Sequence, residues 1–128
     1  MHIQFGMKKN IVLLDDDVMS LRSLENTLQE WGYHTVSFLE YSKDFSHFDF
    51  NDTCCFIVDY HLNCTDGISV LHVLKKLYPN LKSLLISGYI IDEDTLKQNR
   101  TYFSHFMTKP INIRQLNEFL LKIQKEEE

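Results

Sequence analysis

Five short apolar runs, separated by segments of helical periodicity, constrain the fold of this chain more than any other feature. The clearest runs lie at residues 11–14, 54–59 and 81–86. Apart from Lys82, Ser83 and the final Asp59, these runs are apolar without alternation, which is typical of strands covered on both faces of a sheet. Weaker runs at residues 33–39 and 102–107 complete the set. The pattern therefore predicts five strands.

Each predicted strand is followed by a predicted helix. Apolar residues recur at helical spacing in residues 21–31, 67–78 and 112–125. A short helix is expected at residues 92–99, and a short helix or an irregular segment at residues 44–50. Five βα units with short connections imply a parallel sheet with helices on both faces, because each crossover is right-handed and must cover the sheet. In the usual open order, the first and third strands lie side by side where the order reverses. The predicted fold class is a doubly wound α/β fold, (βα)5.

Acidic residues stand at the carboxyl ends of the first and third strands. Asp15, Asp16 and Asp17 follow the first, and Asp59 ends the third. Three successive carboxylates repel one another. One of them could cap the following helix, but a cap needs only one acid, so a cation site accounts for the surplus. The adjacent strand ends should bring Asp15, Asp16 and Asp59 together at one edge of the sheet.

Ser87 and Lys109 reach the same edge from the ends of the fourth and fifth strands. Carboxylates around a small hard cation indicate Mg²⁺, which takes a few carboxylates and keeps several waters. A hydroxyl and an ammonium beside that cation indicate that an anion also binds, and a phosphoryl group meets this need. One carboxylate could then act as the nucleophile toward phosphorus, and Asp59 is the best candidate because it stands alone.

Composition excludes several classes of function. The chain of 128 residues has the length of one domain, and its net charge of −5 argues against direct binding of nucleic acid. No apolar run approaches a membrane span, and no signal peptide is recognisable, so neither membrane association nor export is expected. Cys54 and Cys55 are adjacent and should point to opposite faces of a strand, so no cysteine metal set is expected. We expect a cytoplasmic protein with reduced thiols.

The sequence resembles the receiver domain of bacterial two-component response regulators over residues 8–125. The resemblance depends on several short motifs that occur in a fixed order and at characteristic spacings. They are Asp15-Asp16, Asp59, Asp66-Gly67, Ser87-Gly88, Phe106 and Lys109-Pro110. The resemblance implies a flavodoxin-like fold. It also implies that the domain is not an enzyme, except that it catalyses its own phosphorylation and dephosphorylation.

By this resemblance, Asp59 accepts a phosphoryl group from the phosphohistidine of a sensor histidine kinase or a phosphotransfer protein. The implied cofactor is Mg²⁺. Asp16, Asp59 and the main-chain carbonyl of His61 would bind it directly, and Asp15 would bind it mostly through water. Lys109 would hold one phosphoryl oxygen.

The resemblance also implies a switch, in which Ser87 holds another phosphoryl oxygen and Phe106 moves into the space behind it. The face formed by the fourth helix, the fifth strand and the fifth helix would then bind an output partner or a second copy of the domain. His61 and Tyr89 occupy positions that tune how long the phosphoryl group survives, and we expect both rings to exclude water from it.

Three residues depart from the family pattern. Asn63 replaces the proline usual four residues after the acceptor, Gly88 replaces a more frequent alanine, and Phe106 lacks the hydroxyl of a tyrosine. Two other functions stay open. A haloacid-dehalogenase-type phosphohydrolase also begins with such acids, but it needs a later acidic pair, and here only Glu118 precedes the tail. A receiver-like docking module that is never phosphorylated is the second.

The predicted domain spans residues 8–125. Residues 1–7 are expected to be a disordered or artificially added extension, and residues 126–128 an acidic, solvated tail.

Overall fold

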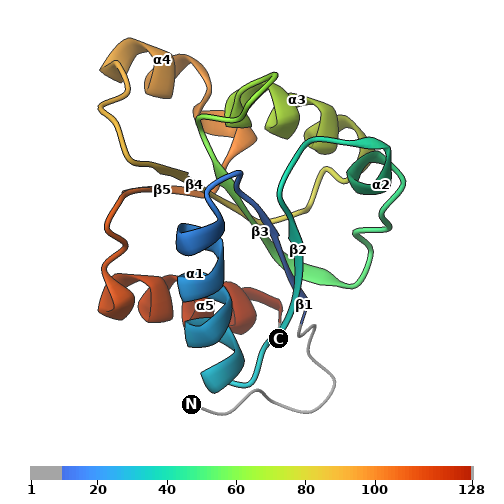
Figure 1. Ribbon diagram of the computed structural model, residues 1–128, viewed down its shortest axis with the longest axis vertical. Helices are drawn as coiled ribbons and strands as arrows, with labels where there is room; N and C mark the ends of the chain where they lie inside the picture. The colour runs from blue at the N-terminus through green and yellow to red at the C-terminus, as the bar shows by residue number, and fades with distance from the viewer. Residues whose placement is uncertain (1–9, 128) are drawn as a thin grey trace.

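One parallel sheet of five strands, flanked by helices on both faces, forms the computed structural model, which describes residues 10–127 (Figure 1). The strands are β1 (Asn10–Leu14), β2 (His34–Phe38), β3 (Thr53–Asp59), β4 (Ser83–Ser87) and β5 (His105–Thr108). The helices are α1 (Val18–Glu30), α2 (Lys43–Ser46), α3 (Gly67–Leu77), α4 (Glu93–Gln98) and α5 (Ile113–Glu127). A 3-10 turn, η1, spans Arg100–Tyr102. The strand order is β2-β1-β3-β4-β5, so the predicted (βα)5 fold is confirmed.

The central strand β3 is buried along its whole length and fixes the position of Asp59. It pairs in parallel with β1 on one side and β4 on the other. Side chains alternate between the two faces of the sheet, so Cys55 and Ile57 pack toward α1 and α5, while Phe56 and Val58 pack toward α2 and α3. Burial on both faces explains why this run is continuously apolar until its final carboxylate.

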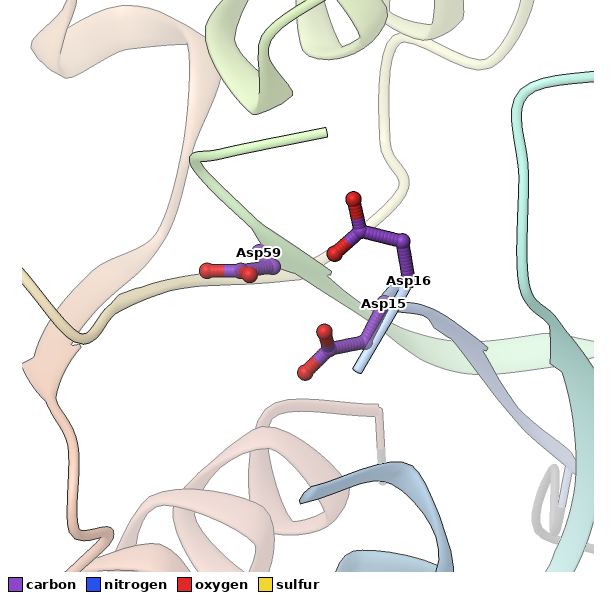
Figure 2. Close-up of side chains that lie close together, drawn as sticks. All are labelled: Asp15, Asp16 and Asp59. Carbon is purple, nitrogen blue, oxygen red and sulfur yellow. The ribbon is translucent and has the colours of Figure 1, made fainter. Parts of the chain in front are cut away.

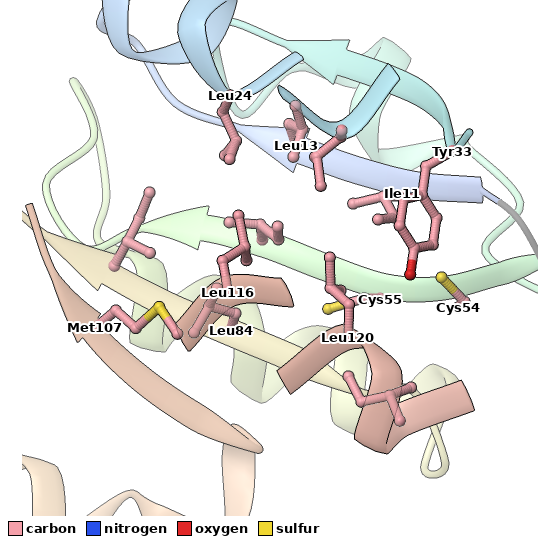
Figure 3. Packing of buried hydrophobic residues seen from close by; sticks show 14 of the residues in the cluster. Ile11, Leu13, Leu24, Tyr33, Cys54, Cys55, Leu84, Met107, Leu116 and Leu120 are labelled. Carbon is pink, nitrogen blue, oxygen red and sulfur yellow. The ribbon is translucent and has the colours of Figure 1, made fainter. Parts of the chain in front are cut away.

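Two core clusters cover the two faces of the sheet. We call the first the aliphatic cluster, because leucine and isoleucine dominate it; α1 and α5 close it (Figure 3). Its helical members are Leu21, Leu24, Leu28, Leu116, Leu120 and Ile123. We call the second the aromatic cluster, because phenylalanine rings fill it beneath α2 and α3. Its rings and their partly buried neighbours include Phe38, Phe45, Phe48, Phe50, Phe56 and Tyr78.

Several predicted boundaries need correction. The fifth strand begins at His105 rather than at residue 102, because Tyr102 belongs to the 3-10 turn. The last helix continues past Lys125 through Glu127, and Glu126 forms an ion pair with Lys82 at 3.4 Å, so these two residues of the predicted tail are helical. The predicted extension at residues 1–7 lies outside the described residues, as does residue 128.

The expectation that Cys54 and Cys55 point to opposite faces is wrong. Both side chains belong to the aliphatic cluster (Figure 3). The pairing of β1 with β3 is irregular at this point: Asn10 pairs with Thr53 and Ile11 with Cys55, so Cys54 is skipped. An extra residue of this kind interrupts the alternation of side chains along a strand.

Candidate functional site

Three carboxylates converge at the carboxyl edge of the sheet, where the adjacent strands β1 and β3 end. Asp15 and Asp16 follow β1, and Asp59 is the last residue of β3. One oxygen from each of the three lies within 4.8 Å of the others, and Figure 2 shows the three side chains gathered in one place. Asp15 and Asp59 are buried, whereas Asp16 is partly exposed. The structure thus brings together the three acids that the strand pattern predicts.

The third acid of the run, Asp17, has a different task, because it caps α1. Its side chain accepts hydrogen bonds from the backbone N–H of Met19 at 3.1 Å and from that of Ser20. Hydrogen bonding by Ser20 lowers the pKa of the Asp17 carboxyl. The backbone N–H of Asp17 in turn donates to Asp15 Oδ1 at 3.0 Å. Asp17 therefore caps α1 and helps to orient Asp15. Asp15 and Asp16 remain available for the pocket.

Lys109, in the loop after β5, supplies the positive charge opposite these acids. Its Nζ donates to Asp15 Oδ2 at 2.9 Å and to Asp59 Oδ2 at 3.4 Å. Burial opposes the charge of the ammonium, but the hydrogen bond and the charges of Asp15 and Asp59 outweigh it, so the pKa of Lys109 is raised. The Lys109–Pro110 peptide bond is cis.

Asp59 is the most perturbed acid of the site. Burial raises the pKa of its carboxyl from 3.8 to about 6, the charge of Asp15 adds to this, and Lys109 opposes it. Its Oδ1 is buried and, among the described residues, has no hydrogen-bond partner. A buried carboxylate oxygen without a partner is costly unless another group binds it. Three carboxylates against one ammonium also leave an excess of negative charge, so the donor set fits a hard cation such as Mg²⁺.

The loop between Asp59 and α3 is held close to the site by Gly67. A Cβ on Gly67 would lie 2.5 Å from the carbonyl oxygen of Asp59, so only glycine permits this approach. The N–H of Gly67 donates to the carbonyl of Tyr60 at 2.8 Å, and Asp66 caps α3 by accepting from the N–H of Ser69 at 2.8 Å. The sequence identifies the Asp66-Gly67 pair as a helix start, but the contact of Gly67 with Asp59 becomes visible only in the fold.

An open hollow of about 740 Å³ gives access to the acids. Two aromatic side chains of its lining, His61 and Tyr89, contact each other edge to face with ring centroids 4.8 Å apart. They come from the loops after β3 and β4, respectively. The full lining is Asp16, Asp17, Asp59, His61, Leu62, Asn63, Gly88, Tyr89 and Lys109.

The two predicted switch residues do not face the acids. Ser87 is fully buried at the end of β4, and its hydroxyl donates to the carbonyl of Tyr89 at 2.7 Å. Phe106 on β5 is half-buried against the aromatic cluster. It also lines a separate groove of about 630 Å³ with Leu96 and Phe103. The sequence places Ser87 at the end of the fourth strand and Phe106 within the fifth, but it gives no information on where their side chains point.

The fold and the site together define a flavodoxin-like α/β domain with a carboxylate pocket at the switch point of its sheet. Residues 11–121 match the family described as the response regulator receiver domain, and the chain belongs to this family. Receiver domains are signalling modules of two-component systems. No curated protein matches the chain. None of the helices within residues 10–127 is long and apolar enough to cross a membrane.

Solved structures support the same fold. A CheY-like receiver domain from Methanospirillum hungatei JF-1 is 24% identical, with a TM-score of 0.79, over 92% of this chain and 98% of that one. The receiver domain dimer of NtrC4, described as beryllofluoride-activated, is 19% identical, with a TM-score of 0.82, over 92% and 98%. DrrB from Thermotoga maritima, an OmpR/PhoB homolog, is 24% identical, with a TM-score of 0.77, and the match covers 95% of this chain but 55% of DrrB.

Proposed function

We propose that this receiver domain accepts a phosphoryl group on Asp59 from the phosphohistidine of a sensor histidine kinase or a phosphotransfer protein. The observation that carries the proposal is the environment of Asp59. It is a buried carboxylate with one unpartnered oxygen, it lies 3.4 Å from the Lys109 ammonium, and it faces an open hollow. A carboxylate oxygen of Asp59 would form the bond to phosphorus while the phosphorus–nitrogen bond of the donor breaks. Lys109 would then pair with a phosphoryl oxygen.

The proposal includes Mg²⁺ as cofactor. Asp16, Asp59 and the main-chain carbonyl of His61 would hold it directly, and Asp15 would hold it mostly through water. The excess of carboxylates over ammonium in the pocket supports this assignment. Bound there, the cation would offset the negative charge of the phosphoryl oxygens. A cation that binds only the folded domain, at a hundredfold excess over its dissociation constant, would stabilise the domain by about 2.7 kcal/mol.

Exposed apolar side chains around the pocket support a protein as the phosphoryl donor. Six of the nine large apolar side chains that are exposed in the described part of the chain surround this edge of the sheet. They open α1 and α5 or follow β2 and β4: Val18, Met19, Leu39, Tyr89, Ile90 and Ile113. A groove of about 430 Å³ between α1 and the start of α5 also reaches Asp15 and Lys109. An apolar rim around a charged centre is typical of a protein-binding surface.

The test compares a small donor with protein donors. Purified domain is incubated in Mg²⁺ with phosphoramidate, or with histidine kinases of the source organism loaded with labelled phosphate. Asp59→Asn should abolish labelling from both. Met19→Ser, whose side chain is 82% exposed, should leave labelling by phosphoramidate intact and slow labelling by the cognate kinase. Labelling of Asp59→Asn at the wild-type rate would contradict the assignment of the acceptor.

The proposal assigns His61 and Tyr89 to the lifetime of the phosphoryl group. Water must attack phosphorus in line, opposite the bond to Asp59, and these two rings line the hollow through which it would come. We expect Tyr89→Ala and His61→Ala each to speed the loss of phosphate from the isolated domain. An unchanged rate in Tyr89→Ala would refute shielding, and slower loss in His61→Ala would mean that the histidine assists water.

The output of the domain belongs to the same proposal. Phosphorylation would draw Ser87 toward the phosphoryl group, let Phe106 move inward, and change the face formed by α4, β5 and α5. That face would bind an output partner or a second copy of the domain, in the cytoplasm. The activated dimer named for NtrC4 supports the second possibility. Chemical-shift changes confined to the metal loops, on addition of a phosphoryl analogue, would contradict this switch.

A further inference from the structure

The hydroxyl of Ser87 is fully engaged with the backbone of one residue, Tyr89. It donates to the carbonyl oxygen of Tyr89 at 2.7 Å and accepts from the N–H of Tyr89 at 3.1 Å. Ser87 is fully buried, so water does not compete for these bonds. A hydroxyl has one proton and can make only one strong donated hydrogen bond at a time. The bond to Tyr89 and a bond to any other acceptor therefore exclude each other.

The ring of Tyr89 depends on few contacts for its position. Tyr89 is 70% exposed to solvent. It contacts the ring of His61 edge to face, with an interplanar angle of 82°, and His61 contacts Tyr60 in the same manner with centroids 4.9 Å apart. Such pairs contribute only modestly to stability. The two hydrogen bonds to Ser87 are thus a principal restraint on the backbone that carries the ring.

His61 and Tyr89 come from different loops, and their contact bridges the hollow that contains Asp59. The contact can persist only while the loop after β4 keeps its present path relative to the loop after β3. Ser87 fixes the first of these loops from beneath, at the end of β4. One buried hydroxyl is therefore connected through a single residue to the two rings above the acid pocket.

We propose that Ser87 is the latch of an aromatic gate, which His61 and Tyr89 form across the mouth of the pocket. The gate is held closed while the Ser87 hydroxyl bonds to the backbone of Tyr89. It is released when the same hydroxyl donates to a phosphoryl oxygen on Asp59 instead. The two rings then no longer close the mouth of the pocket, but they still line the hollow and slow the approach of water to the phosphoryl group. The closed gate is a property of the unphosphorylated domain, since it depends only on the hydrogen bonds between Ser87 and Tyr89. Its release rests on the function proposed above. Because the gate is closed before the donor arrives, its opening also becomes part of phosphoryl entry.

The latch is tested first in the unphosphorylated domain without Mg²⁺. Hydrogen exchange of the Tyr89 amide and the NMR shifts of the His61 ring are compared in wild type, Ser87→Ala and Ser87→Thr. We expect Ser87→Ala to speed exchange of the Tyr89 amide by about tenfold, because this N–H loses the hydroxyl oxygen that accepts its hydrogen bond. The His61 shifts should move toward those measured in Tyr89→Ala. Ser87→Thr keeps the hydroxyl and should resemble wild type.

Ser83→Ala is the matched control, because Ser83 is also a buried serine of β4, at the other end of the strand, where its hydroxyl donates to the carbonyl of Tyr102 at 3.4 Å. It should leave the Tyr89 amide and the His61 ring unchanged. If Ser83→Ala and Ser87→Ala have equal effects on Tyr89, general loosening of β4 explains them and the latch is wrong. Wild-type exchange in Ser87→Ala would also overturn it.

Release is tested by adding beryllofluoride with Mg²⁺ to the wild-type domain. If the analogue binds at Asp59, exchange of the Tyr89 amide should rise toward the rate measured in Ser87→Ala. Binding that leaves this amide protected would overturn release. If the analogue does not bind at Asp59, the proposed function fails, while the comparison of Ser87→Ala with Ser87→Thr still decides whether the latch exists. The two failures are therefore distinguishable.

Discussion

The two faces of the sheet are built differently. The aliphatic cluster lies beneath two long helices, α1 with 13 residues and α5 with 15, whose leucines and isoleucines form a regular stripe. The aromatic cluster lies beneath α2, which has 4 residues, and α3, which has 11. On this face the rings of Phe45, Phe50 and Phe56 contact one another beneath the shorter helices. The helix α4 follows on the same side, and none of its 6 residues is buried.

From this difference we infer that the domain combines a half anchored by α1 and α5 with an edge around α4 that moves more easily. Segments with little buried apolar surface open locally at a lower free energy than the core does. In this molecule they are α4 and the loop before it, which carries the gate residue Tyr89 and the fully exposed Ile90. The anchored half positions Asp15 and Lys109, and the movable edge is free to respond to what binds there.

The strongest way to challenge this comparison is to remove one large side chain from each face. Phe45 is 1% exposed and its ring contacts those of Phe38, Tyr41, Phe50 and Phe56. We expect Phe45→Ala to lower the free energy of unfolding by about 3–5 kcal/mol. Leu116→Ala, on α5, should cost about 2–5 kcal/mol. Urea unfolding measures both, and a small cost for Phe45→Ala alone would mean that the whole aromatic face is loose, not only α4.

A second substitution tests how tightly α3 is joined to the site. Gly67→Ala would place a Cβ 2.5 Å from the Asp59 carbonyl oxygen and 3.1 Å from Leu85 Cδ1. Because backbone must move to make room, we expect a loss of about 1–3 kcal/mol, together with a displaced Asp59 and weaker Mg²⁺ binding. Gly88→Ala is the control, since its Cβ would meet Lys109 Cδ at an ordinary 3.7 Å. Equal costs for the two variants would contradict this contact.

A third prediction concerns Asp59, the buried acid that ends the central strand β3. The raised pKa of Asp59, about 6 against 3.8, means that the folded domain binds its proton more tightly than the unfolded chain does. The contribution of this group to stability is complete below about pH 4 and is lost as the pH rises through about 6. Without Mg²⁺, Asp59→Asn should therefore be more stable than wild type at neutral pH by about 1–2 kcal/mol, after allowance for solvent screening.

Urea unfolding at about pH 4 and about pH 7.5 measures this effect, and the difference between Asp59→Asn and wild type should largely vanish at the lower pH. The control is Asp52→Asn, at an exposed acid in the turn before β3. If Asp59→Asn gained the same free energy of unfolding at both pH values, the charge of Asp59 would not be the source of the gain.

The smallest effect is expected in α4. Leu96 is only partly buried against the aromatic cluster, so Leu96→Ala should cost less than about 1 kcal/mol. Amide exchange in residues 93–102 should nevertheless accelerate, whereas exchange in α1 and α5 should not. If protection is lost throughout the molecule, α4 belongs to the rigid half and the comparison of the two faces must be revised.

Most of the fold could be predicted because it depends on local patterns. Continuous apolar runs indicated the strands, and the rule for parallel sheets placed Asp15, Asp16 and Asp59 at one edge. The errors concern positions where neighbouring segments decide. The sequence gives no sign that β1 skips Cys54, and Tyr102 is apolar enough to extend a strand although it lies in a 3-10 turn.

The arrangement within the site was less predictable, because it depends on distances between segments. That Asp17 rather than Asp15 or Asp16 caps α1 follows from backbone angles. That Lys109 lies closer to Asp15 than to Asp59 follows from the packing of the loop after β5. The hydroxyl of Ser87 donates to the carbonyl oxygen of Tyr89, and no pattern of residue types in the sequence predicts this acceptor.

The ion pair between Lys109 and Asp15 joins residues that lie 94 positions apart in the chain. During synthesis at roughly 5–20 residues per second, about 5–20 s separate the addition of the acid from that of its ammonium partner. Throughout this interval the emerging polypeptide carries its aspartates without that counter-charge, and the ribosome still holds the segment that will complete the pocket. Competence to signal would therefore arise only after the segment that contains Lys109 has been translated, and a product truncated before this residue would lack the ammonium of the pocket.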